Sequence, residues 1–224
     1  MQIPILLPNI FDYPFTYETD LNLKIGDYVL VPFGKSEVTG VVWNEFEKKT
    51  KKKFLIKKVI KKLEVPPLKK QIIEFLNWFS DYNMVPRGMC LKLVLQSNKA
   101  IEKIEKKNFE KFNFQEKKKI FELSNDQKIC LKKMNDVSHK FRVHVLQGTI
   151  GSGKTMVYFE ALKEIINKGF QGLILLPEIG LTGQFEKKFI EFFGFTPAVW
   201  HSGITKKKKE IIWSGIANGE IKVV

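Results

Sequence analysis

One segment of the chain has residue types and spacing that suit it to binding phosphate groups. Eight consecutive residues meet the pattern G-x-x-x-x-G-K-[ST]: Gly148-Thr149-Ile150-Gly151-Ser152-Gly153-Lys154-Thr155. In such a loop the backbone N–H groups and the following helix N-terminus converge on an anion. Lys154 is expected to reach the β- and γ-phosphates of a nucleotide, and the Thr155 hydroxyl to hold Mg²⁺. We therefore expect ATP and Mg²⁺ as cofactors, with the phosphates lined by Gly148, Thr149, Gly151, Ser152 and Gly153.

The flanks of this loop predict the strand and helix that it needs. Residues 143–147 are a short apolar run typical of a buried strand, and residues 156–168 place Val157, Ala161 and Ile165 on one helical face. The alternative is a glycine-rich turn that binds nothing. A strand before the loop and a helix after it favour the phosphate site.

The rest of the C-terminal half alternates between strand and helix patterns. Helices are predicted at 125–135, 181–193 and 206–218, and strands at 172–176, 198–201 and 221–224. This rhythm is typical of a parallel sheet with right-handed crossovers. We expect this α/β domain to occupy residues 123–224.

The N-terminal part shows a different pattern, rich in short β segments. Apolar or alternating runs separated by turn residues predict strands at 3–7, 11–17, 28–33, 38–44 and 54–63, which indicates a small barrel or sandwich. Helical spacing follows at 68–79 and 89–95. We expect a β-rich domain over residues 1–97 and a basic linker, or a reduced winged helix, over 98–122.

The charge of the chain is concentrated in its middle third. Residues 48–119 carry 21 basic and 7 acidic side chains, net +14, which equals the net charge of the whole chain. A concentrated basic region is what binding to a nucleic-acid backbone requires. Nearly all the basic residues are lysine, however. A coding bias toward A/T-rich codons therefore explains the excess of lysine as well as nucleic-acid binding does.

Cysteine usage and hydropathy indicate the cellular compartment of the protein. Cys90 and Cys130 are the only cysteines, and they form neither a disulfide framework nor zinc-ligand spacing. No apolar run approaches the length needed to cross a membrane. We expect a cytoplasmic protein that makes no membrane contact.

Several of these segments together resemble the primosomal replication-restart helicases of bacteria, which are superfamily 2 DNA helicases. Five stretches carry the resemblance: Phe11-Asp12-Tyr13, Val31-Pro32-Phe33-Gly34-Lys35, the phosphate loop, Leu176-Pro177-Glu178-Ile179-Gly180-Leu181-Thr182 and His201-Ser202-Gly203. The resemblance implies an N-terminal domain that binds a DNA 3′ end, followed by the first part of a RecA-like ATPase domain. It also implies a stalled replication fork with a nascent 3′ end as the DNA partner. Single-stranded DNA, single-stranded DNA-binding protein and other primosome proteins are further implied partners.

The resemblance also implies roles for particular residues. Gln127 lies where the family has its adenine-reading glutamine, and Thr182 where related helicases contact a single-strand phosphate; a surface glutamine and a helix cap are the alternatives. The family's pocket for a 3′ end maps to Phe11, Asp12, Gly34 and Lys57, with Lys58 an alternative to Lys57. A stacking ring, an acceptor for a 3′-hydroxyl and a lysine near the phosphate suit that task.

Departures from the family pattern concern hydrolysis. The sequence contains no Asp-Glu-Glu-His motif to polarise Mg²⁺ and the attacking water, and no zinc-binding cysteines. The pattern predicts a truncated helicase that binds DNA and nucleotide without turnover. Two alternatives stay open: a stand-alone fork-binding module, and a phosphate-loop helicase of another superfamily 2 branch. The Phe-Asp-Tyr and Pro-Phe-Gly-Lys pair argues against the latter.

Overall fold

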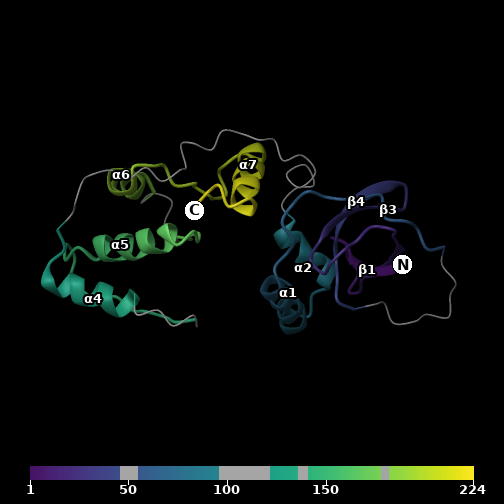
Figure 1. The fold of residues 1–224 in the computed structure, drawn as a ribbon, viewed down its shortest axis with the longest axis horizontal. Coiled ribbons are helices and arrows are strands. Elements are labelled where there is room, and N and C mark those ends of the chain that lie inside the picture. Colours follow the sequence, from purple (N-terminus) through teal and green to yellow (C-terminus); the bar gives the residue numbers. More distant parts are fainter. Residues whose placement is uncertain (46–54, 96–121, 136–140, 178–181) are drawn as a thin grey trace. The chain divides into compact units, whose positions relative to one another are not determined.

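A computed structural model describes residues 1–45, 55–95, 122–135, 141–177 and 182–224. Its residues divide into two units: one combines the described part of 1–107 with 205–218, and the other the described part of 108–204 with 219–224. Figure 1 shows the fold as a ribbon, with the elements labelled where there is room. The strands are β1 (Gln2–Leu6), β2 (Phe15–Glu18), β3 (Tyr28–Phe33), β4 (Ser36–Val42) and β5 (Lys61–Lys62). The helices are α1 (Lys70–Asn83), α2 (Arg87–Val94), α4 (Asn125–Asn135), α5 (Lys154–Asn167), α6 (Thr182–Phe193) and α7 (Lys206–Ala217).

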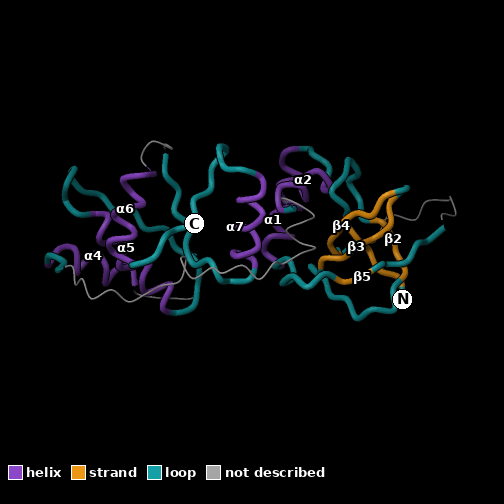
Figure 2. Tube along the Cα trace, turned by 90° about the horizontal axis from the view of Figure 1, so that it is seen from above, coloured by secondary structure: helices purple, strands orange, loops and turns teal. Residues whose placement is uncertain are grey.

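The strands of the first unit form an antiparallel sheet that closes on itself. Their order is β2-β1-β4-β3-β5. Figure 2 shows the strands in orange. The residues just before β5 return to the opposite edge, where Glu18 N donates to Lys57 O at 2.9 Å and Val59 N to Glu18 O at 2.8 Å. Closure removes the free sheet edges that would otherwise need covering. The sheet is therefore a small barrel, one of the two architectures that the strand spacing predicts.

Alternation along the strands divides the apolar side chains between two cores. Val29 and Val31 of β3 face one way and join the core inside the barrel, with Ile5 and Tyr17. A second core lies between the sheet and the helices, and its residues are Leu6, Tyr28, Leu30, Val41, Trp43, Leu63, Val65, Leu68, Ile73, Leu76, Cys90, Leu91 and Leu95. Helices α1 and α2 thus cover one outer face of the barrel.

Helix α7 also contributes to this unit. Trp213 and Ala217 pack against the core between sheet and helices, and the Trp213 ring meets the Tyr28 ring edge-on with centroids 6.5 Å apart. Thr205 caps the helix by accepting from Lys208 N at 3.3 Å. The prediction of a helix at 206–218 is confirmed to within one residue.

Two of the N-terminal strands differ from the sequence prediction. The strand expected at 11–17 begins only at Phe15, because residues 9–14 form a loop. The strand expected at 54–63 is reduced to Lys61–Lys62 and an isolated bridge at Lys58. The predicted strand at 28–33 is confirmed at both ends. The linker expected at 98–122 lies outside the described residues, apart from Glu122.

The second unit is built around a cluster of aromatic side chains. Phe159 of α5 is fully buried among rings of α6 and the turn after it, which belong to Phe185, Phe189, Phe192, Phe193 and Phe195. The nearest pair, Phe189 and Phe193, stacks with centroids 4.3 Å apart. Edge-on and offset rings of this kind add to the free energy of burial. The cluster holds α5 against α6.

The parallel sheet expected in this unit is only partly formed. Among the described residues of this unit, a single parallel bridge joins Gly172 to Val223, and Ala198 N donates to Val223 O at 2.9 Å. Residues 143–147 do not form a strand, and the side chains of Val143 and Val145 are 74% and 89% exposed. The strand prediction there is wrong for this structure, because an apolar strand in a parallel sheet needs partners on both sides. The α/β organisation itself is confirmed.

None of the helices among the described residues is both long enough and apolar enough to cross a lipid bilayer.

Candidate nucleotide and DNA-end sites

The phosphate loop leads directly into α5, as the spacing of its residues predicts. Gly151 and Gly153 have φ values of +83° and +77°, which are conformations that glycine adopts at little cost. A Cβ on Gly153 would collide with the Gln127 amide nitrogen. Gly153 is the N-cap residue of α5, so the unpaired N–H groups of the first helical turn begin at the loop. The local backbone therefore suits an anionic group.

The side chain of Lys154 lies folded over this loop. Its ammonium donates to Gly148 O and to Thr149 O, both at 2.7 Å. The two carbonyls hold the positive charge beside the loop, where a phosphate would meet it. Lys154 and the Thr155 hydroxyl fit the donor set for a Mg–nucleotide: the ammonium would contact phosphate, and the hydroxyl would contact the metal ion.

Gln127 connects the loop to α4. Ser124 and Gln127 form a capping box, with Ser124 N donating to Gln127 Oε1 at 2.9 Å and Gln127 N to Ser124 Oγ at 3.3 Å. Gln127 Nε2 also donates to Ser152 O at 3.0 Å. The amide keeps a second N–H and a second lone pair, so it can still pair with an adenine edge. Its adenine role stays a prediction, but its position beside the loop is a finding.

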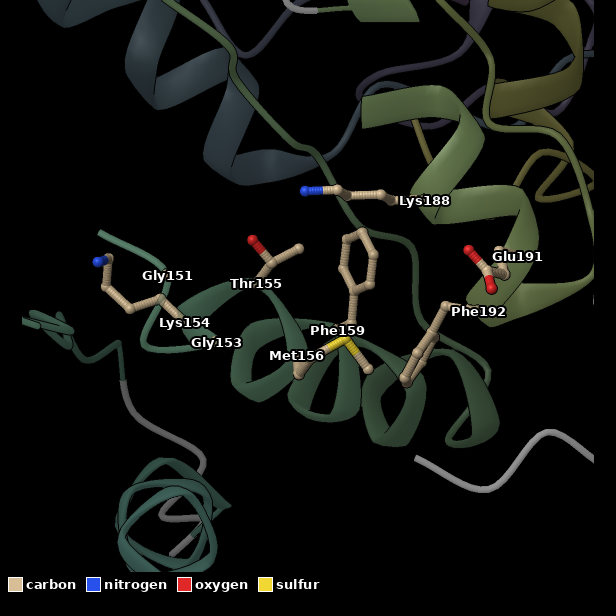
Figure 3. Close-up of a pocket in the computed structure, with 9 residues that line it drawn as sticks. All are labelled: Gly151, Gly153, Lys154, Thr155, Met156, Phe159, Lys188, Glu191 and Phe192. Carbon is tan, nitrogen blue, oxygen red and sulfur yellow. The ribbon is translucent and has the colours of Figure 1, made fainter. Parts of the chain in front are cut away.

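A cavity of about 400 Å³ opens beside the loop, between α5 and α6. Figure 3 shows its lining: Gly151, Gly153, Lys154, Thr155, Met156 and Phe159 from the loop and α5, and Lys188, Glu191 and Phe192 from α6. The Lys188 side chain extends from α6 toward the side of the pocket that carries Thr155 (Figure 3). Sequence reasoning did not single out Lys188, because nothing distinguishes it from the other lysines.

The structure describes the remaining helicase-like residues only in part. Helix α6 begins at Thr182, but the side chain of Thr182 and residues 178–181 lie outside the described part of the chain. The Thr182 prediction is therefore untested. His201 Nδ1 accepts from Gly203 N at 3.1 Å, so this histidine stabilises the turn before α7.

On the N-terminal barrel, Phe11 belongs to a chain of aromatic rings on the loop before β2. Its ring lies 5.5 Å from Phe15, and Phe15 lies 5.2 Å from Phe33, the last residue of β3. Tyr13 packs against both Phe11 and Phe15. Phe11 is 36% exposed, so part of its ring remains available to stack on a base.

The aromatic chain leads to Gly34 and Lys57. Gly34 follows Phe33 in the two-residue β3–β4 turn and has a φ of +62°. Lys57 Nζ donates to Gly34 O at 3.2 Å, whereas Lys58 Nζ lies 3.6 Å from Asp20 Oδ2. The structure therefore brings Lys57, rather than Lys58, to the Gly34 turn. The rings of Phe15 and Phe33 lie in contact between Phe11 and the Gly34 turn that Lys57 reaches.

Asp12 is held by the start of α2. Its Oδ1 accepts from Arg87 N at 2.9 Å, and its carbonyl accepts from Arg87 Nε at 2.8 Å. Burial, and next the negative charge of Asp12, raise the pKa of the Cys90 thiol in α2. Sequence reasoning did not find Arg87, although it is one of only two arginines among 38 basic residues.

Among the residues that the structure describes, no three His, Cys, Asp or Glu side chains lie close enough to hold a metal ion.

Comparison with protein families divides the chain near the same boundary, except that α7, which belongs to the first structural unit, lies within the second match. Residues 2–96 match the family described as the 3′ DNA-binding domain of PriA, and residues 120–224 match the family described as type III restriction enzyme, res subunit. The barrel strands with α1 and α2 lie within the first match, and the phosphate loop with α4, α5 and α6 lies within the second.

Comparison with individual curated proteins gives the names of the relatives. The chain is 36% identical to the replication restart protein PriA of Rickettsia conorii over 222 residues, which are 98% of this chain and 33% of that protein. It is 37% identical to the protein of the same name from Rickettsia felis over 224 residues, with the same coverage. The Bacillus subtilis protein of that name is 33% identical over 104 residues, 46% of this chain and 13% of its own length. The chain is thus related to PriA over nearly all of its length, and it spans about a third of the length of the Rickettsia relatives.

Proposed function

We propose that this chain is the DNA-end-recognising and nucleotide-binding part of an ATP-dependent 3′→5′ DNA helicase. Such an enzyme would recognise stalled or abandoned replication forks and start primosome assembly for replication restart. Forked DNA with a nascent 3′ end, single-stranded DNA, single-stranded DNA-binding protein and other primosome proteins are the partners that this function requires. ATP with Mg²⁺ is the cofactor, and cytoplasm the compartment.

One observation carries the proposal. A segment that matches a 3′ DNA-binding domain is joined, in a single chain, to a helicase-type segment with an intact phosphate loop. Within the first segment, Phe11, Asp12, Gly34 and Lys57 supply a ring, an acceptor, a turn and a cation. These groups suit the terminal nucleotide of a DNA strand. The ring stacks the base, the carboxylate accepts from a 3′-hydroxyl, and the ammonium offsets phosphate charge.

The test compares two forked DNAs that differ only at the nascent 3′ end. One ends in a 3′-hydroxyl and the other in a 3′-phosphate, and the whole 224-residue chain is titrated with each. The Asp12 carboxylate accepts from the hydroxyl but repels the phosphate. Because an unpaired acceptor costs about 1–3 kcal/mol, the blocked end should bind roughly five- to hundred-fold more weakly. Equal affinities for the two forks would refute the proposal.

Two variants show whether the preference belongs to Asp12. Asp12→Asn keeps an oxygen to accept from Arg87 N but removes the charge, so the preference for 3′-hydroxyl should largely disappear. Asp20→Ala is the matched control, because this acid is 88% exposed and pairs only weakly with Lys58. The control should keep the wild-type preference.

A second candidate function is DNA binding without ATP turnover. The sequence lacks an Asp-Glu-Glu-His motif, so the carboxylates that activate water in related enzymes are missing from these residues. On this view the phosphate loop of the chain binds nucleotide but does not hydrolyse it. Release of phosphate above the level of a Lys154→Ala variant would decide for hydrolysis.

A further inference from the structure

Arg87 connects three separate parts of the first unit. It is the first residue of α2, and its backbone N–H donates to the Asp12 carboxylate. Its side chain donates from Nε to the Asp12 carbonyl and from Nη1 to Glu45 Oε2, both at 2.8 Å. One planar guanidinium therefore holds the loop before β2 and the residues after β4 in a fixed relation.

The same helix end is pressed closely against that loop. Gly88 N donates to Phe11 O at 3.1 Å. A Cβ on Gly88 would lie only 2.6–2.7 Å from the carbonyl oxygens of Leu7, Asn9 and Phe11. The first two N–H groups of α2, which no helical carbonyl can satisfy, are thus both used to fix residues 11 and 12.

The charges around Arg87 exclude a role as a phosphate contact. Its side chain is only 18% exposed and pairs with Glu45 at 2.8 Å and with Asp12 Oδ1 at 3.5 Å. Two carboxylates against one guanidinium leave the group with a net negative charge, which repels a DNA backbone. Arg87 therefore contacts protein groups, Asp12 and Glu45, rather than the DNA.

From this geometry we infer that Arg87 is a positioning residue for recognition of a DNA 3′ end. It fixes the direction of the Asp12 carboxylate and occupies one of the two carboxylate oxygens, so that the other is presented to the 3′-hydroxyl. This inference rests on the proposed function, because it needs Asp12 to contact the terminal nucleotide. A carboxylate on a loosely held loop would discriminate poorly between chain ends.

The experiment measures the ratio of the dissociation constants for the 3′-phosphate and 3′-hydroxyl forks in the whole chain. Arg87→Ala removes both side-chain hydrogen bonds, to the Asp12 carbonyl and to Glu45, and should lower the ratio about three- to tenfold. Arg87→Lys should lower it by a similar factor, because one ammonium cannot replace a planar fork that donates in two directions. Circular single-stranded DNA, which has no end, should bind every variant within about twofold of wild type.

Two further variants separate the contacts. Arg87→Pro also removes the backbone N–H that donates a hydrogen bond to Asp12 Oδ1. Proline suits this first helical position, because Pro86 before it has an extended backbone (φ −53°, ψ 135°). Its ratio should fall below that of Arg87→Ala. Glu45→Gln is the matched control: it removes a charge from the group but leaves the Arg87 contacts to Asp12. Its ratio should stay within about twofold of wild type.

The outcomes are distinct. A wild-type ratio of one overturns the proposed function and this role with it. A wild-type ratio well above one that is unchanged in Arg87→Ala and Arg87→Lys overturns the positioning role alone. Equal losses on circular DNA and on the 3′-hydroxyl fork, or a Glu45→Gln ratio as low as that of Arg87→Ala, would show a general structural effect and also overturn it. If Arg87→Ala fails to melt cooperatively, Arg87→Lys decides.

Discussion

The barrel unit and the phosphate-loop unit use apolar residues of similar type in different ways. In the barrel, strand residues such as Ile5, Val29 and Val31 are completely buried, and a returning segment closes the sheet. In the phosphate-loop unit, the helices share a buried phenylalanine cluster, but Val143 and Val145 lie largely exposed. The difference shows that a closed antiparallel sheet satisfies its own edges, whereas strands of a parallel sheet depend on partners distant in sequence.

The largest effect that this comparison predicts is in amide hydrogen exchange. Amides paired between β3 and β4, such as those of Val29 and Val31, should exchange at least about a thousandfold more slowly than those of Val143 and Val145. Exchange followed by mass spectrometry or NMR on the whole chain would measure this. Similar protection in the two segments would contradict the comparison and indicate that residues 143–147 are paired in solution.

Side-chain truncation should show the same contrast in stability. Ile5→Ala removes a side chain with 0% exposure from the barrel interior and should lower the free energy of unfolding by about 2–5 kcal/mol. Val145→Ala, at 89% exposure, should change it by less than about 0.5 kcal/mol. Urea denaturation followed by circular dichroism is the measurement. A cost above about 1 kcal/mol for Val145→Ala would mean that this valine is buried.

Nucleotide binding tests whether the second unit keeps a working phosphate loop despite its incomplete sheet. Lys154→Ala should weaken binding of a fluorescent Mg–nucleotide by about tenfold or more, because it removes the cation held over the loop. Lys168→Ala, a change in the exposed lysine that follows the last residue of the same helix, should have little effect. Equal binding by wild type and Lys154→Ala would show that nucleotide does not use this loop.

A further predicted effect is a dependence of barrel stability on alkaline pH. Burial raises the pKa of Tyr17 and of Tyr28 to about 12, above the ordinary value of 10.0. Their stabilising contribution is full below about pH 10 and is lost as the pH rises toward 12, since only the unfolded chain ionises in that window. The unfolding free energy from urea titrations should therefore be lower at pH 11 than at pH 8.

Tyr17→Phe sharpens this test. The variant should lose about 1 kcal/mol at pH 8, because the Tyr17 hydroxyl donates to Pro32 O at 3.2 Å. Between pH 8 and 11 it should lose less stability than wild type, since one ionising group is gone. An identical pH dependence in the two proteins would show that Tyr17 does not contribute to it.

Local patterns predicted much of the fold. Alternation and turn residues located β3, and helical patterning located α4. These signals lie within a few residues of one another, so the sequence contains them directly. The strand predicted at 143–147 is wrong in this structure for the opposite reason. Its apolar run shows that the segment favours burial, but not whether partner strands are present.

For the candidate sites, the sequence alone determined the phosphate loop, because glycine, lysine and threonine at fixed offsets are sufficient to form it. Only the tertiary structure distinguished the positions of Lys57 and Lys58. Adjacent residues in an extended segment point to opposite sides, so closure of the barrel sends one ammonium to Gly34 and the other to Asp20. Only the tertiary structure revealed Arg87 beside Asp12, because the contact joins residues 75 positions apart, and no local pattern reports such a pairing.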